Sequence, residues 1–176
     1  MILMKLLLFP SEAEDSVAAE DISNLQLAWE MLELAKVIYE KKAKNPVAEK
    51  RMEAQASLCE AITGLGEGAF VSGNYGLALE EFTSCLKARQ GELPKDSRSI
   101  AESHFQVARV HAAMGKLPET EENMKAAMMV LEERASNLSK MEFSTHLIDE
   151  VADLEELGIS LEEMLVEFKV DIFVET

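Results

Sequence analysis

Apolar residues recur along most of this chain at the spacing of one face of an α-helix. In the stretch 47–72, Leu58, Ile62, Leu65 and Ala69 lie three or four positions apart with polar residues between them. Such residues share one face because a helix turns once in about 3.6 residues. Ala, Leu, Glu, Met and Lys dominate, whereas aromatic residues make up only 6%. This composition favours helix over strand nearly everywhere, so the sequence predicts an all-α fold.

The chain contains an internal repeat. When Leu65-Gly66 is set against Val107-Ala108, Gly73 falls on Gly115. Each unit has the pattern of a helix, a glycine-containing turn and a second helix. Glycine adopts the positive φ common at a helix end, and Pro118 suits the first turn of the next helix. The sequence therefore predicts two helical hairpins.

The hairpins resemble tetratricopeptide repeats. The signature small and large residues of that motif are present in the first unit as Leu65-Gly66, Tyr75, Ala78 and Phe82. The second unit is a looser match, because Thr120 and Met124 stand where the motif prefers Ala and an aromatic residue. The resemblance implies helical hairpin repeats arranged as an α-solenoid.

A half repeat and a capping helix are expected on either side of the two hairpins. Ser23-Asn24-Leu25-Gln26 fits a capping box that opens a helix to about Lys44. This helix has the pattern of a repeat's second helix, with no convincing first helix before it. It should dock on the helix that follows it, and something else should cover its other face. From Ser144 to Lys169 an amphipathic pattern predicts a final helix, which Gly158 could bend.

These elements give a predicted domain organisation. We expect residues 1–20 to form a disordered or weakly ordered acidic segment and residues 21–170 to form the repeat domain. Within that domain we predict the half repeat 21–44, the repeats 47–93 and 96–141, and the capping helix 144–169. A terminal helix of this kind covers the last apolar face of a repeat stack.

The chain is strongly acidic, with a formal net charge of -16. Direct binding to nucleic acid is not expected, because phosphate contacts require a basic surface. The charge serves solubility alone, or it attracts a strongly basic partner. No apolar run approaches the about 20 residues of a membrane span. Met1 to Phe9 is apolar but interrupted by Lys5, so we predict no secretory signal.

No catalytic constellation or cofactor site is visible, so we predict that the chain is not an enzyme. Gly64 to Gly68 lies inside a helical pattern and follows no strand, which excludes a phosphate-binding loop. Cys59 and Cys85 are expected to be free core thiols. His104 and His111 fall on the second unit's core stripe and lack further ligands at a suitable spacing, so we expect core or boundary histidines instead of a metal site.

Several long runs resemble the nuclear autoantigenic sperm protein family of histone chaperones. In order, the runs are Asp21–Tyr39, Leu65–Glu67, Ser72–Tyr75, Glu81–Leu86, Asp96–Gln106 and Val130–Arg134. The resemblance covers about residues 20–140. It implies a chain that binds histone three, alone or paired with histone four, in histone supply and chromatin assembly. It also implies a nuclear location, with a cytoplasmic pool left open.

The chain departs from the family's pattern in three ways. The family's first repeat and half of its second repeat have no counterpart in this sequence. Of the family's acidic tract, only the segment from about Glu12 to Asp21 corresponds to a remnant. No Lys/Arg cluster is present near the C-terminus. We therefore expect a truncated or divergent relative. Two other functions stay open: a general tetratricopeptide adaptor for another peptide, and a shortened copy with weak or no histone binding.

The expected histone-binding residues lie away from the core stripes of the two first helices. They are Glu60, Glu67 and Phe70 in the first unit, and Glu102 and Phe105 in the second. In tetratricopeptide repeats these positions line a concave groove. Carboxylates beside aromatic rings suit a basic amphipathic helix, since carboxylates accept bidentate Arg contacts and the rings supply apolar anchors. The alternative is that these residues are ordinary solvated helix faces.

By the resemblance, Glu67, Glu102 and Phe105 match the acidic and aromatic positions that the family uses to hold histone three. Phe105 replaces a tyrosine there, so the ring is kept and the hydroxyl is lost. Arg109 stands where the family has an aliphatic residue. It should repel a basic ligand unless Glu67 or Glu102 pairs with it.

Overall fold

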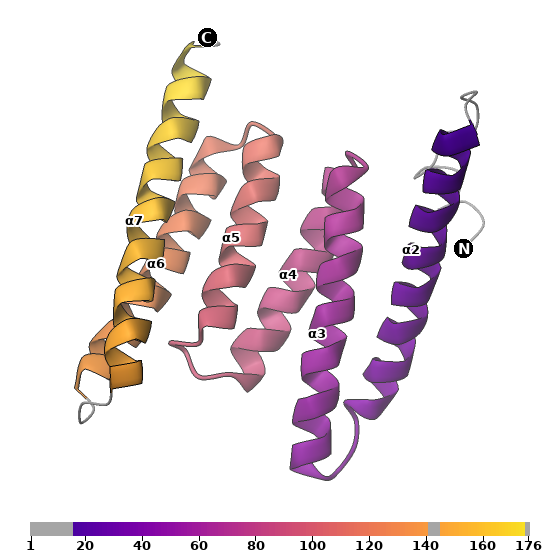
Figure 1. Cartoon of the computed structure of the whole chain (residues 1–176), viewed down its shortest axis with the longest axis horizontal. Helices are drawn as coiled ribbons and strands as arrows, with labels where there is room; N and C mark the ends of the chain where they lie inside the picture. Colours follow the sequence, from indigo (N-terminus) through magenta and orange to yellow (C-terminus); the bar gives the residue numbers. More distant parts are fainter. Residues whose placement is uncertain (1–15, 141–144, 175–176) are drawn as a thin grey trace. The chain divides into compact units, whose positions relative to one another are not determined.

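The computed structural model describes residues 16–140 and 145–174, and these residues form six helices (Figure 1). They are α2 (Ser16–Lys42), α3 (Ala48–Val71), α4 (Tyr75–Glu92), α5 (Arg98–Ala113), α6 (Leu117–Ser139) and α7 (Thr145–Val174). The prediction of an all-α helical-repeat fold is confirmed. Residues 1–15, most of the segment predicted to be weakly ordered, lie outside the described residues. The chain divides within α4 into a first unit ending at Cys85 and a second beginning at Leu86, and each unit is described by itself.

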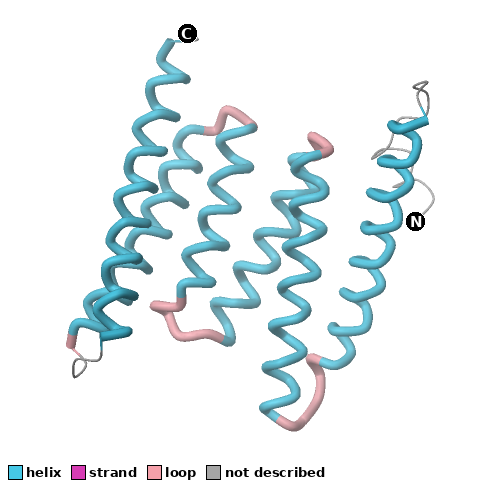
Figure 2. The backbone as a smooth tube through the Cα atoms, in the orientation of Figure 1, coloured by secondary structure: helices cyan, strands magenta, loops and turns pink. Residues whose placement is uncertain are grey.

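The two hairpin turns are short loops (Figure 2), and both use glycine as predicted. Gly73 and Gly115 have positive φ angles of 74° and 69°, a conformation that side chains with a Cβ rarely adopt. In each turn, the backbone N–H of the residue after the glycine donates a hydrogen bond to a carbonyl in the last turn of the preceding helix. Asn74 N donates to the carbonyl oxygen of Ala69, and Lys116 N donates to that of His111, both at 2.9 Å. This pattern ends each helix and reverses the chain. Pro118 lies in the first turn of α6, as expected.

The predicted helix boundaries need two corrections. α2 begins at Ser16, so the start predicted from the capping box at Ser23 is wrong. Residues 16–22 contain no Pro or Gly, so they can adopt helical conformation ahead of the capping box. Ser23 therefore lies inside α2 and not at its start. α7 continues past Lys169 to Val174 and passes through Gly158 without a break.

In the first unit, α2 packs on α3, as predicted for the half repeat (Figure 1). Two glycines of α3 allow this contact, because a Cβ at Gly64 would lie 3.0 Å from the side chain of Leu32, and one at Gly68 would lie 3.4 Å from Trp29. The predicted core stripe of α3, from Leu58 to Ala69, is buried. A Cβ at Gly66 would lie 2.6 Å from the ring of Phe82 in α4, so a glycine is needed where α3 and α4 meet.

An ion pair links α2 to α4 in the same unit. Lys36 Nζ donates to both carboxylate oxygens of Glu81, at 2.7 and 2.8 Å. Glu81 is buried, so this pair satisfies a carboxylate that water scarcely reaches. Cys59 and Cys85 are buried core thiols that form no disulfide with each other, as predicted.

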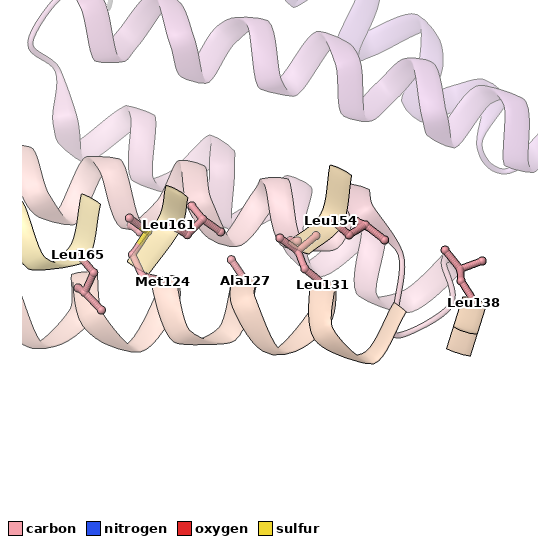
Figure 3. Packing of buried hydrophobic residues seen from close by; sticks show 9 residues of the cluster. Met124, Ala127, Leu131, Leu138, Leu154, Leu161 and Leu165 are labelled. Carbon is pink, nitrogen blue, oxygen red and sulfur yellow. The ribbon is translucent and has the colours of Figure 1, made fainter. Parts of the chain in front are cut away.

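In the second unit, α7 covers α6 as predicted for a capping helix (Figure 3). The buried cluster joins the two helices through side chains on facing stripes: Met124, Ala127 and Leu131 on α6, and Leu154, Leu161 and Leu165 on α7. Two ion pairs join the same helices, Arg134 with Glu150 at 2.7 Å and Lys169 with Glu121 at 3.0 Å.

The two histidines lie at the boundary of the second unit's core, as expected. His104 Nδ1 is 3.1 Å from the amide oxygen of Asn123. His111 is half-buried, and its Nδ1 is buried without a hydrogen-bond partner in the described part of the chain.

Ser97 occupies the N-cap position of α5 but makes no side-chain hydrogen bond to the helix end.

Candidate functional site

Three of the five predicted binding residues share one face of α3 in the first unit. Glu60, Glu67 and Phe70 are spaced by seven and three positions, which places them together, opposite the buried stripe. Glu60 is exposed, and Glu67 is half-buried. Two helical turns separate these carboxylates by about 10 Å. Phe70 is half-buried, and its ring centroid lies 5.6 Å from that of Tyr75 at a tilt of 54°. This face therefore presents two carboxylates and the edge of an aromatic pair.

The other two predicted residues share a face of α5 in the second unit. Glu102 is exposed, and its carboxylate accepts a hydrogen bond of 3.1 Å from Arg89 Nη1. The same nitrogen donates to the carbonyl of Ser99 and the hydroxyl of Ser103, both at 2.9 Å. Only 13% of the Arg89 side chain is exposed, against 55% of the Glu102 side chain. Arg89 thus belongs to the site, although the sequence pattern gave no signal for it.

Phe105 contributes less free surface than expected. It is half-buried and packs against the apolar cluster of the second unit. Arg109, one turn further along α5, is also half-buried, and its Nη1 donates to the side-chain oxygen of Gln106. The α5 face therefore offers one exposed carboxylate, part of one ring and one guanidinium. A groove that combines the α3 and α5 faces draws on both units, and it stays a prediction.

A groove between α6 and α7 was missed at the level of sequence. It has a volume of about 530 Å³, an apolar floor that includes Met128, Leu131 and Leu154, and a rim of three carboxylates, Glu132, Glu155 and Glu162. Such a surface can accept an apolar side chain flanked by basic ones. The sequence does contain a signal for this groove, because Gly158 and Ile159 lie between Glu155 and Glu162, which are one heptad apart. The predicted role of this helix as a cap does not use that signal.

Two titratable groups of the second unit have shifted pKa values. Burial lowers the pKa of His111 below its ordinary 6.5, and Lys116 adds to this effect while Glu119 and Glu122 oppose it. Hydrogen bonds from Lys125 and Lys169 lower the pKa of Glu121 below its ordinary 4.5. Neither group is one of the predicted binding residues of α3 and α5. The two pKa shifts therefore bear on how the stability of the second unit depends on pH.

Among the described residues, no group of three or more His, Cys, Asp or Glu side chains is arranged to hold a metal ion. Across the ranges 16–140 and 145–174, we find no helix whose length and apolar content would let it traverse a membrane.

Several known proteins are similar to part of this chain. The human nuclear autoantigenic sperm protein is 34% identical over 121 residues, which is 69% of this chain and 14% of that protein. The histone-binding protein N1/N2 of Xenopus laevis is 34% identical over 115 residues, 65% of this chain and 18% of its own. The protein HGV2 of Halocynthia roretzi is 36% identical over 122 residues, 69% of this chain and 23% of its own.

The match is confined to part of each relative. The chain spans less than a quarter of the length of these three proteins. No protein-family model matches it. The resemblance noted in the runs between residues 20 and 140 is nevertheless confirmed by relatives from several species. The chain is a partial relative of the nuclear autoantigenic sperm protein family.

Proposed function

We propose that this chain is a histone chaperone-like protein that binds histone three, alone or paired with histone four, through the acidic and aromatic faces of α3 and α5. One observation carries the proposal: a chain with a net charge of -16 is related to a protein named for histone binding. The role fits histone supply and chromatin assembly, with the protein in the nucleus and a further pool in the cytoplasm.

The charge and exposure of the two faces fit a basic helical ligand. Glu60 and Glu102 are exposed, so each can accept a bidentate contact from an arginine of the ligand. Glu67 and the ring edge of Phe70 lie on the same face of α3 as Glu60, so an apolar side chain of the ligand would pack beside the charged contacts. Binding of this kind shields basic histone surfaces from nucleic acid and consumes no ATP.

Glu102 can exchange its partner at a modest energetic cost. When Glu102 turns towards a ligand, Arg89 loses one hydrogen bond but keeps those to Ser99 and Ser103. Nη1 of Arg89 therefore keeps two neutral acceptors when its carboxylate partner leaves.

The proposal is tested by titrating a labelled histone three–histone four dimer with the full chain and three variants of equal net charge. Glu67→Lys/Glu102→Lys alters the proposed site. Glu155→Lys/Glu162→Lys alters the rim of the α6/α7 groove, and Glu156→Lys/Glu163→Lys alters exposed carboxylates of α7 outside that groove. We expect the first variant alone to lose about a hundredfold in affinity, because each reversal removes a charged contact and adds repulsion.

The other outcomes are equally informative. A similar loss in all three variants would mean that only net charge matters, and a loss confined to Glu155→Lys/Glu162→Lys would move the site to α7. Wild-type binding no tighter than that of an unrelated acidic protein would reject the chaperone proposal. It would leave the adaptor and the shortened-copy hypotheses.

A further inference from the structure

The α6/α7 groove lies open above a buried apolar floor. Leu131 of α6 and Leu154 of α7 line it and are 3% and 1% exposed, as members of the buried cluster in Figure 3. Ile159 also lines the groove but is 58% exposed. A Cβ added at Gly158 would meet nothing within 4 Å. The described residues therefore leave room at Gly158, and an apolar side chain brought by a partner can pack there.

Small side chains explain why α6 and α7 leave this room. Ala135, Ser136 and Ser139 line the groove on α6, and Gly158 lines it on α7. Packed helices lie about 8–10 Å apart, so short side chains at a contact leave part of the space between them unfilled. The volume of about 530 Å³ lies within the range of about 300–1,000 Å³ that is typical of ligand sites. The groove is thus large enough to take apolar side chains of a partner.

The rim of the groove is acidic on both helices. Glu132 of α6 and Glu155 and Glu162 of α7 are all exposed. None of the described residues that line the groove is Lys or Arg. α7 contains nine Asp and Glu residues but only one Lys and no Arg, and that lysine, Lys169, pairs with Glu121 at 3.0 Å. Charge complementarity therefore favours a cationic partner.

We propose that the α6/α7 groove binds a basic amphipathic helix of another protein. Glu155 and Glu162 are one heptad apart, which is about 10 Å along α7. A partner helix that runs beside α7 and carries Lys or Arg residues one heptad apart can place a cation at each carboxylate. The apolar residues between those cations then lie over Gly158 and Ile159, as in other helices that bind in grooves. The inference does not depend on histone binding through α3 and α5.

Such a partner needs both its cations and its apolar residues. Exposed ion pairs contribute little by themselves, so the rim carboxylates set the position of the partner and the preference for cations. The apolar floor supplies most of the affinity, because burying one Leu side chain contributes more than an exposed ion pair does. A polycation without large apolar residues should therefore bind weakly.

The experiment adds a designed peptide to the ¹⁵N-labelled full chain and follows the backbone amide chemical shifts. The peptide is an alanine-based helix with two Arg residues one heptad apart and two adjacent Leu residues between them. A matched peptide carries Ser in place of each Leu. We expect the Leu peptide to shift the amides of Met128, Ala135, Gly158 and Ile159. It should bind at least about tenfold more tightly than the Ser peptide.

Three variants of the chain locate the site. Gly158→Leu fills the groove without changing any charge, and it should keep the wild-type Tm because a Cβ at this position meets nothing within 4 Å. Glu155→Lys/Glu162→Lys reverses the charge of the rim. Glu156→Lys/Glu163→Lys changes exposed carboxylates outside the groove by the same charge. We expect the first two variants to lose at least about tenfold in affinity for the Leu peptide, and the third to lose less than about threefold.

Several results would overturn the proposal. Equal binding of the Leu and Ser peptides, or equal losses in the two charge-reversal variants, would mean that net charge alone governs binding. Undiminished binding to folded Gly158→Leu would place the peptide elsewhere, as would shift changes confined to α3 and α5 or no shift changes at all. Histone affinity should be the same in Gly158→Leu and the wild type, so this proposal and the proposed function can fail separately.

Discussion

The ion pair between Lys36 and Glu81 makes a sharp prediction about how the half repeat is held. Removing the lysine by Lys36→Met leaves a buried carboxylate without its partner. Breaking a fully buried pair in this way costs about 3–5 kcal/mol. The Lys36 side chain is 23% exposed and that of Glu81 8% exposed, so water partly replaces the lost partner. We therefore expect the free energy of unfolding to fall by about 2–3 kcal/mol.

The assay uses Trp29, the single tryptophan of the chain, which packs against Gly68 of α3. Its fluorescence during a urea titration therefore reports directly on the docking of α2. Lys41→Met is the matched control, because Lys41 is an exposed lysine of the same helix, and its effect should stay below about 0.5 kcal/mol.

The double variant Lys36→Met/Glu81→Met separates the two energetic contributions. Replacing both partners removes the buried charge, so stability should return to within about 1 kcal/mol of the wild type. If Lys36→Met behaved like Lys41→Met, or if the double variant were as unstable as the single one, the reasoning would be refuted.

Three further predictions concern the glycines of α3 and α7, the pKa of His111 and the charge of Arg109. Gly66→Ala should lower the free energy of unfolding by about 1–3 kcal/mol, because the new Cβ would lie 2.6 Å from the Phe82 ring. A Cβ at Gly158 would meet nothing within 4 Å. Gly158→Ala should therefore raise the free energy of unfolding by up to about 1 kcal/mol in the same urea titration. Because the pKa of His111 is lowered in the folded chain, the unfolded chain binds a proton at a higher pH than the folded chain does. The stability present above about pH 6.5 is therefore lost as the pH falls below that value. Between about pH 7.5 and 5.5, Tm should fall more in the wild type than in His111→Gln. Given the proposed function, Arg109→Leu should tighten histone binding about three- to tenfold at low salt by removing a like charge, and an unchanged Kd would show that Arg109 does not face the ligand.

The helical hairpins could be predicted because the signals that specify them are local. The buried stripe from Leu58 to Ala69 follows from apolar spacing, and the positive φ of Gly73 and Gly115 follows from a glycine at each helix end. The start of α2 could not be predicted, because the capping box at Ser23 is a local signal inside a longer helix-forming stretch.

The candidate site was less accessible to sequence reasoning. Arg89 reaches Glu102 from a neighbouring helix, and no periodicity within one helix encodes that contact. Phe105 was expected to face a groove, yet part of its ring packs on the core of the second unit. The α6/α7 groove depends on how two helices meet, so its acidic rim appears only when both are placed.

Photo-crosslinking from the proposed face tests histone binding through α3 and α5 most directly. Benzophenone residues replace Phe70 and Phe105 in turn, because an aromatic group then replaces an aromatic group. A third protein carries the label at Met129, an exposed position of α6. We predict that the first two labels crosslink to histone three in the histone three–histone four dimer and that the Met129 label does not. Equal yields from all three positions, or no crosslink from Phe70 and Phe105, would contradict the account.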